Sequence, residues 1–264
     1  MLKTQRIIWF LQHPQLYREF LRRIQVNIQL LFTSQPTEQN QEKAKAKRWC
    51  EEKSCDTQTA ILKITNSPIP SSFNEKFLDE IKTATEITNN CPVKMGAAGN
   101  LEIIYQLTEY IQATRIIETG VAYGWSSFAF LLSLKNRSRA MLVSTDFPYF
   151  IKDSEKYVGC VVPKELKAMW TLISYPDRDA IPKAIKILPT IDLCHYDSDK
   201  SYAGRLWAYP QLWQVLRSGG IFISDDIDDN FGFRDFCNSI DQEPLIVKTW
   251  EASGVKYVGV LIKP

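Results

Sequence analysis

The 264-residue sequence is poor in the residues on which several kinds of site depend. It contains two histidines, His13 and His195, so a site with three histidine ligands is excluded and zinc chemistry is disfavoured. A Ser-His-Asp site would depend on His195 alone. The six cysteines include no Cys-x-x-Cys pair and are too few for the disulfide framework of a small secreted domain. We therefore expect reduced thiols and a cytoplasmic protein.

Strong net charge and long apolar runs are also absent. The 32 lysines and arginines nearly balance the 30 aspartates and glutamates, so the net charge of +2 indicates no nucleic-acid partner. No apolar run reaches the ~18 residues of a membrane-spanning helix, and the run at 7–11 is too short for a secretory signal. The remaining composition, 45% hydrophobic and 23% charged, is typical of a globular protein with a buried core.

The N-terminal part of the chain is expected to be helical. Apolar residues at three- and four-residue spacing predict an amphipathic helix over 15–32, with the stripe Tyr17, Phe20, Leu21, Ile24, Ile28 and Leu31. We expect this stripe to dock on the main domain or on a second copy of the chain, with peripheral membrane contact as the alternative. The polar segment 33–53 is interpreted as a solvated loop or an exposed helix, and further helices are predicted over 57–64, 73–88 and 101–111.

From residue 114 onward, short apolar runs alternate with helical segments such as 126–135 and 202–216. This alternation predicts an α/β fold with a doubly wound, mainly parallel sheet. The last two runs are joined by a link too short for a crossover helix, so they should form an antiparallel hairpin at one edge of the sheet. Seven strands are predicted, over 115–119, 140–145, 170–174, 191–195, 221–224, 244–249 and 256–262.

The first chemical motif is a strand that enters a glycine turn and then a helix. Gly120 and Gly124 would allow a ligand to approach the backbone at the carboxyl end of the strand. Asp146 ends the next strand, where a carboxylate can accept hydrogen bonds from the two hydroxyls of a ribose. The Gly-x-Gly-x-x-Gly fingerprint and the P-loop motif are absent. A nucleoside cofactor other than a dinucleotide is indicated.

The second motif is a set of acids at the ends of two further strands. Asp197 and Lys200 follow one strand, and Asp225 and Asp226 follow the next. Neighbouring parallel strands would bring these carboxylates together, and clustered carboxylates favour a hard divalent cation such as Mg²⁺. The alternative is that they are solvated or cap a helix. His195, within its strand, is expected to be a core histidine rather than a catalytic one.

With these motifs, residues 95–263 resemble the class I S-adenosylmethionine-dependent methyltransferases. The Glu-x-Gly-x-x-x-Gly-x-Ser form is similar to that of the branch with catechol, caffeoyl-CoA and bacterial sugar O-methyltransferases. The resemblance implies a seven-stranded Rossmann-like methyltransferase domain over 95–264 and leaves 1–94 as a helical extension and linker. It also implies a set of residues that bind S-adenosylmethionine: Glu118, Gly120, Tyr123, Gly124 and Ser126 at the methionine, Asp146 at the ribose and Asp177, with the rest of 175–178, at the adenine.

Metal-dependent members of that branch have Asp-x-x-Lys after the fourth strand and Asp-Asn after the fifth. The resemblance therefore implies metal ligands at Asp197, Asp225 and Asp226, with Asp226 in the position of the asparagine. Lys200 would be the base, provided that its pKa is depressed, and Asp197 would orient the substrate. Many sugar-modifying relatives have histidine where this chain has Lys200.

The expected activity is methyl transfer from S-adenosylmethionine to a hydroxyl of a small molecule or glycan precursor, assisted by Mg²⁺ or another divalent cation. A catechol-like aromatic acceptor is the second choice. Two other functions remain open: a metal-independent methyltransferase acting on nitrogen or on a small acid, and a non-catalytic S-adenosylmethionine-binding protein that docks a partner. A homo-oligomer is compatible with the amphipathic N-terminal helix.

Overall fold

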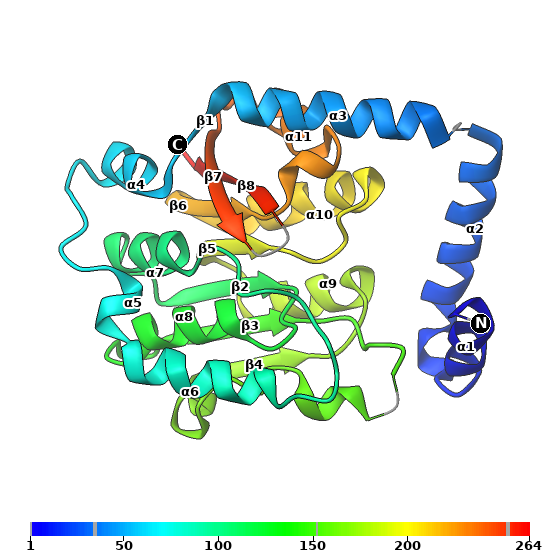
Figure 1. Ribbon diagram of the computed structural model, residues 1–264, viewed down its shortest axis with the longest axis horizontal. Coiled ribbons are helices and arrows are strands. Elements are labelled where there is room, and N and C mark those ends of the chain that lie inside the picture. Colours follow the sequence, from blue (N-terminus) through cyan, green and yellow to red (C-terminus); the bar gives the residue numbers. More distant parts are fainter. Residues whose placement is uncertain (1, 34–35, 152, 252–253) are drawn as a thin grey trace.

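The computed structural model describes residues 2–33, 36–151, 153–251 and 254–264, with side chains for all of these except 2–6, 26–33 and 36–39. One sheet runs through its centre in the order β1-β7-β8-β6-β5-β2-β3-β4 (Figure 1). The strands are β1 Ser54–Cys55, β2 Arg115–Thr119, β3 Met141–Thr145, β4 Trp170–Ile173, β5 Ile191–Tyr196, β6 Leu216–Ser224, β7 Leu245–Glu251 and β8 Gly254–Ile262.

All seven predicted strands form, and the mainly parallel α/β architecture is confirmed. β8 runs antiparallel to both β6 and β7, whereas the other pairs are parallel. The sheet has an eighth strand that the sequence analysis did not predict. It consists of Ser54 and Cys55, which pair in parallel with β7, so the C-terminal hairpin does not itself form the edge. Two residues without an apolar run leave no strand signal in the sequence.

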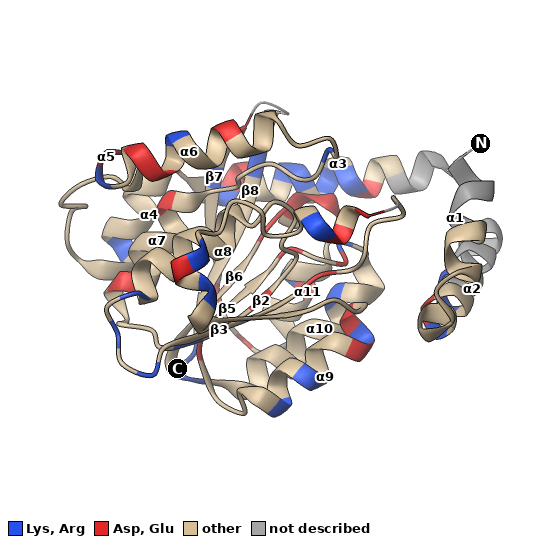
Figure 2. Ribbon diagram, turned by 90° about the horizontal axis from the view of Figure 1, so that it is seen from below, with Lys and Arg blue, Asp and Glu red and all other residues tan. Residues whose placement is uncertain are grey.

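Helices cover both faces of the sheet, as Figure 2 shows in a view from below. The helices α4 to α8 pack on one face, and α3, α9, α10 and α11 pack on the other. The helices are α1 Leu2–Leu11, α2 Tyr17–Thr33, α3 Pro36–Lys53, α4 Thr57–Thr65, α5 Phe73–Lys76, α6 Leu78–Asn89, α7 Leu101–Tyr110, α8 Trp125–Leu134, α9 Asp177–Ile187, α10 Tyr202–Val215 and α11 Gly232–Ser239.

The central strands are buried on both faces, which explains their nearly continuous apolar sequences. In β2, Ile116 packs with the α7–α8 layer, and its neighbour Ile117 packs with the α9–α10 layer. In β6, Ile223 packs with the α7–α8 layer, and its neighbour Phe222 packs with the α9–α10 layer. Successive side chains of a strand point to opposite faces, so each of these strands joins two cores.

The chain reverses its direction of travel through the sheet between β2 and β5. It passes from β2 outward to β3 and β4 and then returns to place β5 on the other side of β2. In an open α/β sheet, such a switch point leaves a crevice beyond the carboxyl ends of the strands. The glycine turn after β2 and the acids after β5 both lie there.

The N-terminal arm, defined as residues 2–33, is a helical hairpin of α1, a short 3-10 turn and α2 beside the main body (Figure 1). Trp9, Phe10 and Leu16 are buried against Phe147 and Phe150 of the loop after β3. The arm therefore docks on the main body through an aromatic cluster.

Only part of the predicted apolar stripe of α2 docks. Phe20 packs in the aromatic cluster, whereas Leu21 and Ile24 remain exposed, so the main domain does not cover them. Their cover by a second copy of the chain stays a prediction. The side chains of Ile28 and Leu31 lie outside the described residues. A surprising residue on the docked side is Glu19, which is only 4% exposed because Arg22 and Arg23 both pair with it. Among the described helices, none has the length and apolar character needed to cross a bilayer.

Candidate functional site

A cavity of about 780 Å³ opens at the carboxyl ends of the central strands. Its walls come from the loops after β2, β3, β5 and β6, from the start of α9 and from the N-terminal arm. It brings together most of the polar residues that the sequence analysis singled out: Gly120, Ser126, Asp146, Asp177, Asp197, Lys200, Asp225 and Asp226.

The glycine turn after β2 lets two loops meet at the floor of this cavity. Gly120 has a φ of 82°, and a Cβ atom there would collide with the carbonyl oxygen of Asp197. Gly124 has a φ of 91° at the start of α8, and a Cβ there would lie 2.8 Å from the Cα of Gly159. Both positions need glycine for backbone conformation and for space. The turn thereby places the end of β2 directly beside Asp197.

Asp146 ends β3 on the wall of the cavity, where the ribose carboxylate was predicted. Its Oδ2 accepts a hydrogen bond from the backbone N–H of Ala122, 3.2 Å away. Burial raises the pKa of Asp146 to about 7, although the neighbouring backbone N–H groups oppose this rise. The carboxylate is thus poorly solvated without a ligand and is available to accept hydroxyl hydrogen bonds from the cavity.

Three of the predicted cofactor residues do not line the cavity but lie beneath it. Glu118 is fully buried, and its Oε2 accepts hydrogen bonds from Ser127 and Ser144. The Tyr123 hydroxyl donates to the carbonyl of Val93 at 2.8 Å. Together with Gly124, these residues shape the turn from below. Their predicted contacts with the methionine part of the cofactor stay a prediction.

The segment 175–178, predicted to lie beside the adenine, lines the cavity in part and contacts the N-terminal arm in part. Asp177 lines the cavity, and its Oδ2 accepts hydrogen bonds from Ser198 at 2.6 Å and from Tyr196 at 3.2 Å. Tyr175 instead packs against the aromatic cluster of the N-terminal arm, and the Lys183 ammonium lies 3.5 Å from the centre of its ring. Tyr175 thus joins the arm to the cavity wall.

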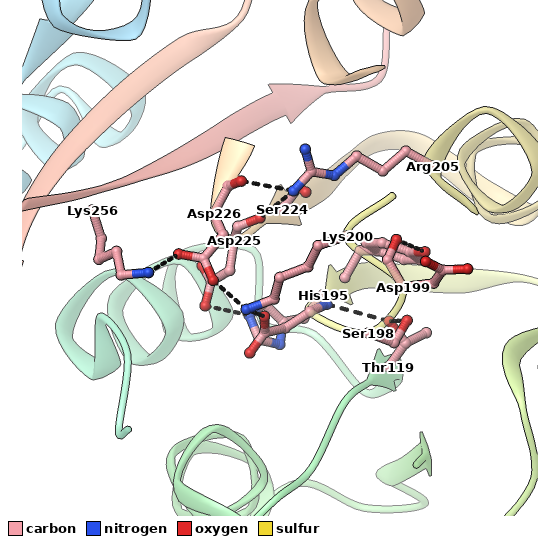
Figure 3. A network of polar contacts seen from close by, with 12 residues as sticks. Thr119, His195, Ser198, Asp199, Lys200, Arg205, Ser224, Asp225, Asp226 and Lys256 are labelled. Carbon is pink, nitrogen blue, oxygen red and sulfur yellow. Dashed lines mark hydrogen bonds and ion pairs between the residues drawn. The ribbon is translucent and has the colours of Figure 1, made fainter. Parts of the chain in front are cut away.

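The acids after β5 and β6 meet at one side of the cavity, as adjacent strands predict. The Lys200 ammonium pairs with Oδ1 of Asp197 at 3.0 Å and with Oδ2 of Asp226. The other oxygen of Asp226 accepts a hydrogen bond from Lys256 Nζ at 2.8 Å. Figure 3 shows Lys256 of β8 and Lys200 of the loop after β5 reaching the Asp225–Asp226 turn. Lys256 comes from β8, and nothing in the sequence motifs pointed to it.

His195 is a buried core residue, as predicted, but it also touches the acid cluster. Its Nε2 lies 3.5 Å from Asp225 Oδ2, and its Nδ1 lies 3.8 Å from Glu118 Oε1. These separations are ion-pair contacts without hydrogen-bond geometry. Burial lowers the pKa of His195, but the two carboxylates outweigh burial and raise it to about 10. A protonated His195 therefore offsets the negative charge of Asp225 from the buried side of the cavity wall.

A lysine that acts as a base needs a lowered pKa, and Lys200 does not have one. Burial favours neutral Lys200, but Asp197 and Asp226 raise its pKa above the ordinary value. Burial and the neighbouring Asp225 raise the pKa of Asp197, although Lys200 opposes this rise. The predicted base therefore remains protonated, whereas the carboxylate beside it becomes the better proton acceptor of the pair.

The three carboxylates do not fit a divalent cation in this arrangement. Lys200 and Lys256 occupy both oxygens of Asp226, Lys200 also contacts Asp197, and His195 faces Asp225. Within the described residues, no group of three or more His, Cys, Asp or Glu side chains is arranged to hold a metal ion. The ligands that the sequence motif implied are therefore gathered in one place but paired with cations of the chain.

A buried arginine fixes the turn that carries Asp225 and Asp226. Arg205 of α10 is fully buried and donates to the carbonyl of Asp226 at 2.7 Å. Its Nη1 also donates to Asn230 Oδ1 at 3.3 Å, and Asn230 donates to the carbonyl of Lys200 at 2.8 Å. Arg205 thus connects the two acidic loops. The helix pattern of 202–216 placed Arg205 in a helix but gave no sign that it would be buried.

The N-terminal arm closes one side of the cavity. Glu19, Arg22 and Arg23 line it, and Arg22 Nη2 lies 3.4 Å from Asp199 Oδ2. The guanidinium of Arg23 lies 4.4 Å from the centre of the Phe147 ring. These contacts hold α2 against the loop that follows Asp146.

Comparison with known proteins finds a matching family over the middle of the chain. A family model described as a methyltransferase domain matches residues 117–227, which include the glycine turn, Asp146, Asp197 and both residues of the Asp225–Asp226 turn. No curated protein matches the sequence.

Solved structures of O-methyltransferases share the architecture. An O-methyltransferase from Bacillus cereus in complex with S-adenosylhomocysteine is 14% identical, with a TM-score of 0.56 over 81% of this chain and 100% of that one. An O-methyltransferase of tomaymycin synthesis from Streptomyces achromogenes, in complex with S-adenosylmethionine, is 15% identical, with a TM-score of 0.53 over 70% and 90%. A TDP-rhamnose 3′-O-methyltransferase of calicheamicin biosynthesis is 13% identical, with a TM-score of 0.50 over 74% and 96%.

At these identities the solved structures show a shared fold, and the family model identifies the domain within it. The chain has the fold of the class I methyltransferases, and its residues 117–227 match the model of a methyltransferase domain. Its architecture is that of the bacterial O-methyltransferases.

Proposed function

We propose that the protein transfers a methyl group from S-adenosylmethionine to a hydroxyl oxygen of a small molecule or glycan precursor. The observation that carries this proposal is the position of the Asp197–Lys200 pair in the cavity that also contains Asp146. A carboxylate suited to a nucleoside lies on one wall, and a paired proton acceptor and cation lie on another. An O-methyltransferase needs both of these features in one cavity.

The residues around Asp146 fit a nucleoside cofactor. The cavity wall there combines a half-buried carboxylate with the backbone of the turn 120–122 and the hydroxyl of Ser126. When bound, S-adenosylmethionine would supply a methyl group already activated on its sulfonium. Asp146 would hold the ribose, and the start of α9 at Asp177 would border the adenine.

Asp197 would take the proton from the acceptor hydroxyl. Its raised pKa makes its carboxylate a stronger base than an exposed aspartate, and the adjacent Lys200 ammonium would stabilise negative charge on the acceptor oxygen. The oxygen then bonds to the methyl carbon while the carbon–sulfur electron pair returns to sulfur. Asp197 and Lys200 thus keep the two catalytic positions implied by the motif, with the base assigned to Asp197.

The acceptor class is inferred from the cavity and its relatives. The cavity is also lined by Lys200, Lys256, Arg22 and Arg23, whose donors suit an oxygen-rich acceptor. Among the similar folds, one is described as a TDP-rhamnose methyltransferase. A sugar hydroxyl is therefore our first choice, and a catechol-like aromatic is the second. The six free cysteines keep the cytoplasm as the proposed location.

The test is product detection by mass spectrometry. Purified protein, S-adenosylmethionine carrying a deuterated methyl group and a panel of sugar nucleotides, glycosides and catechols should yield a deuteromethyl ether of one acceptor class. Asp197→Asn protein serves as the control because it keeps the shape of the cavity. If S-adenosylhomocysteine binds but no acceptor is methylated, the non-catalytic binding function would replace this proposal. A product methylated on nitrogen would favour the other alternative.

A further inference from the structure

The acid cluster is paired with two lysines, one of which the metal-dependent motif does not contain. Asp226 adds a negative charge where the motif has a neutral asparagine. Lys256 reaches this carboxylate from β8, with its Nζ 2.8 Å from Asp226 Oδ1. Lys200 contacts the other oxygen of Asp226 and also Asp197. Both oxygens of Asp226 are therefore occupied by ammonium groups of the chain.

Lys256 is placed to act on the acceptor and not only on the fold. It lines the cavity, and its side chain is 32% exposed. The strand register places it opposite Thr249 of β7, which also lines the cavity. An ammonium has three N–H donors, and Asp226 Oδ1 takes one of them. The remaining donors allow Lys256 to contact an oxygen in the cavity.

We propose that methyl transfer by this protein needs no metal ion, and that Lys256 is a catalytic residue that takes the place of the cation by binding the acceptor oxygen. This inference rests on the proposed function. Asp226 holds the ammonium in place, and Lys200 stands on its other side. A divalent cation entering the cluster would have to displace both lysines from Asp226 and would add two uncompensated positive charges.

Binding of Mn²⁺ tests the charge balance without any need for turnover. We expect the electron paramagnetic resonance signal of free Mn²⁺ to be unchanged by the wild-type protein, with or without S-adenosylhomocysteine. Lys256→Met removes the ammonium from Oδ1 of Asp226, so this variant should gain a saturable Mn²⁺ site that Mg²⁺ competes for. Lys248→Met, which removes a lysine from the neighbouring strand outside the cavity, is the matched control and should gain none.

Turnover tests the role of Lys256 itself. Wild-type activity should be the same in EDTA and in excess Mg²⁺. Lys256→Met should lower kcat roughly 10²- to 10³-fold, the usual effect of losing one oxyanion donor, and Lys256→Arg should recover at least part of that loss. Circular dichroism and S-adenosylhomocysteine affinity should confirm that both variants fold.

Two results would overturn the inference. One is a wild-type protein that binds one Mn²⁺ per chain in competition with Mg²⁺, or that stops turning over in EDTA. The other is a Lys256→Met variant that neither gains Mn²⁺ binding nor loses turnover. Absence of any methylated product would instead reject the proposed function, and the Mn²⁺ measurement would still be interpretable.

Discussion

At the scale of single residues, Asp146 gives the most direct test of nucleoside binding in the cavity. Replacing it with asparagine should weaken S-adenosylhomocysteine binding by roughly 10- to 100-fold, because a charged hydrogen-bond acceptor for the ribose is lost. Wild-type affinity should also fall as the pH drops below about 7, since protonation removes the same acceptor. Isothermal titration calorimetry across pH measures both effects.

The control for Asp146 is Asp153→Asn, which removes a carboxylate from the same loop outside the cavity. This variant should bind the ligand normally and keep the pH dependence. Equal affinity of Asp146→Asn and wild-type protein at pH 8 would show that Asp146 does not bind the ribose.

Asp197 and Lys200 should fail in different ways when replaced. Asp197→Asn should lower kcat by about 10²- to 10⁴-fold, the usual contribution of a positioned base, and should abolish the rise of rate with pH. Lys200→Met should keep that rise but move it to higher pH, because Lys200 lowers the pKa of Asp197. Steady-state rates over a range of pH separate the two roles. A rise lost in Lys200→Met and kept in Asp197→Asn would assign the base to Lys200.

At the scale of elements, the apolar runs in the sequence predicted the strands, whereas features that depend on long-range packing were not predicted. The seven apolar runs became strands because each is buried on both faces. The predicted helix over 73–88 is instead divided at Phe77, whose φ of −127° and ψ of 38° place its backbone outside the helical region. Its ring is buried against Phe73 and Tyr105, and the contact with Tyr105 is a long-range one that helical spacing does not record.

The polar segment 33–53 illustrates the same limit. Most of it forms the helix α3, with Ala46 and Cys50 buried among polar residues and Lys43 paired with Asp229. The sequence leaves the choice between loop and helix open, because two small buried residues make a weak pattern.

The sequence does not indicate Lys256 as a site residue for a related reason. A lysine near the start of an antiparallel strand has no motif, and only the pairing of β8 beside β6 brings it to Asp226.

The N-terminal arm is an element whose removal should affect the cavity more than the fold. Deleting residues 1–33 uncovers Phe147 and Phe150, which lie in the loop that begins at Asp146. We expect a 3- to 10-fold loss of S-adenosylhomocysteine affinity, about 1 kcal/mol, because the freed loop must be ordered on binding. The far-ultraviolet circular dichroism should retain its α/β form. Calorimetry and light scattering measure the affinity and the mass.

Light scattering on the full chain also tests what covers the exposed Leu21 and Ile24. A dimer that becomes a monomer on deletion of the arm would identify a second copy as the cover. Association of the full chain with anionic vesicles, lost on deletion, would favour the membrane alternative. Unchanged ligand affinity in the deleted protein would contradict a role of the arm in the cavity.

For the whole molecule, the buried ionisable groups predict how stability depends on pH. Burial raises the pKa of Asp146, Asp177, Asp197 and Asp228, so the folded state keeps protons that the unfolded state releases above pH ~4. His195 acts in the same direction at higher pH, because its folded pKa of about 10 exceeds its ordinary value of 6.5. Both contributions make the ligand-free protein less stable as the pH rises.

Other carboxylates act in the opposite sense but in a different range. Burial opposes ionisation of Asp226, Glu19 and Asp192, yet cations and hydrogen bonds hold the pKa of each below its ordinary value. Their stabilisation is present above pH ~4 and is lost in stronger acid. The free energy of unfolding should therefore be greatest in mildly acidic solution.

Urea unfolding of the ligand-free protein between about pH 5.5 and pH 8.5 measures this slope, which linkage relates to the difference in bound protons. We expect a lower midpoint at the alkaline end. Asp146→Asn should flatten the slope below pH ~7, since it removes a proton held only by the folded state, and should leave the slope above pH ~7 to His195. A midpoint that rises steadily toward pH 8.5 would show that the folded state does not hold these protons.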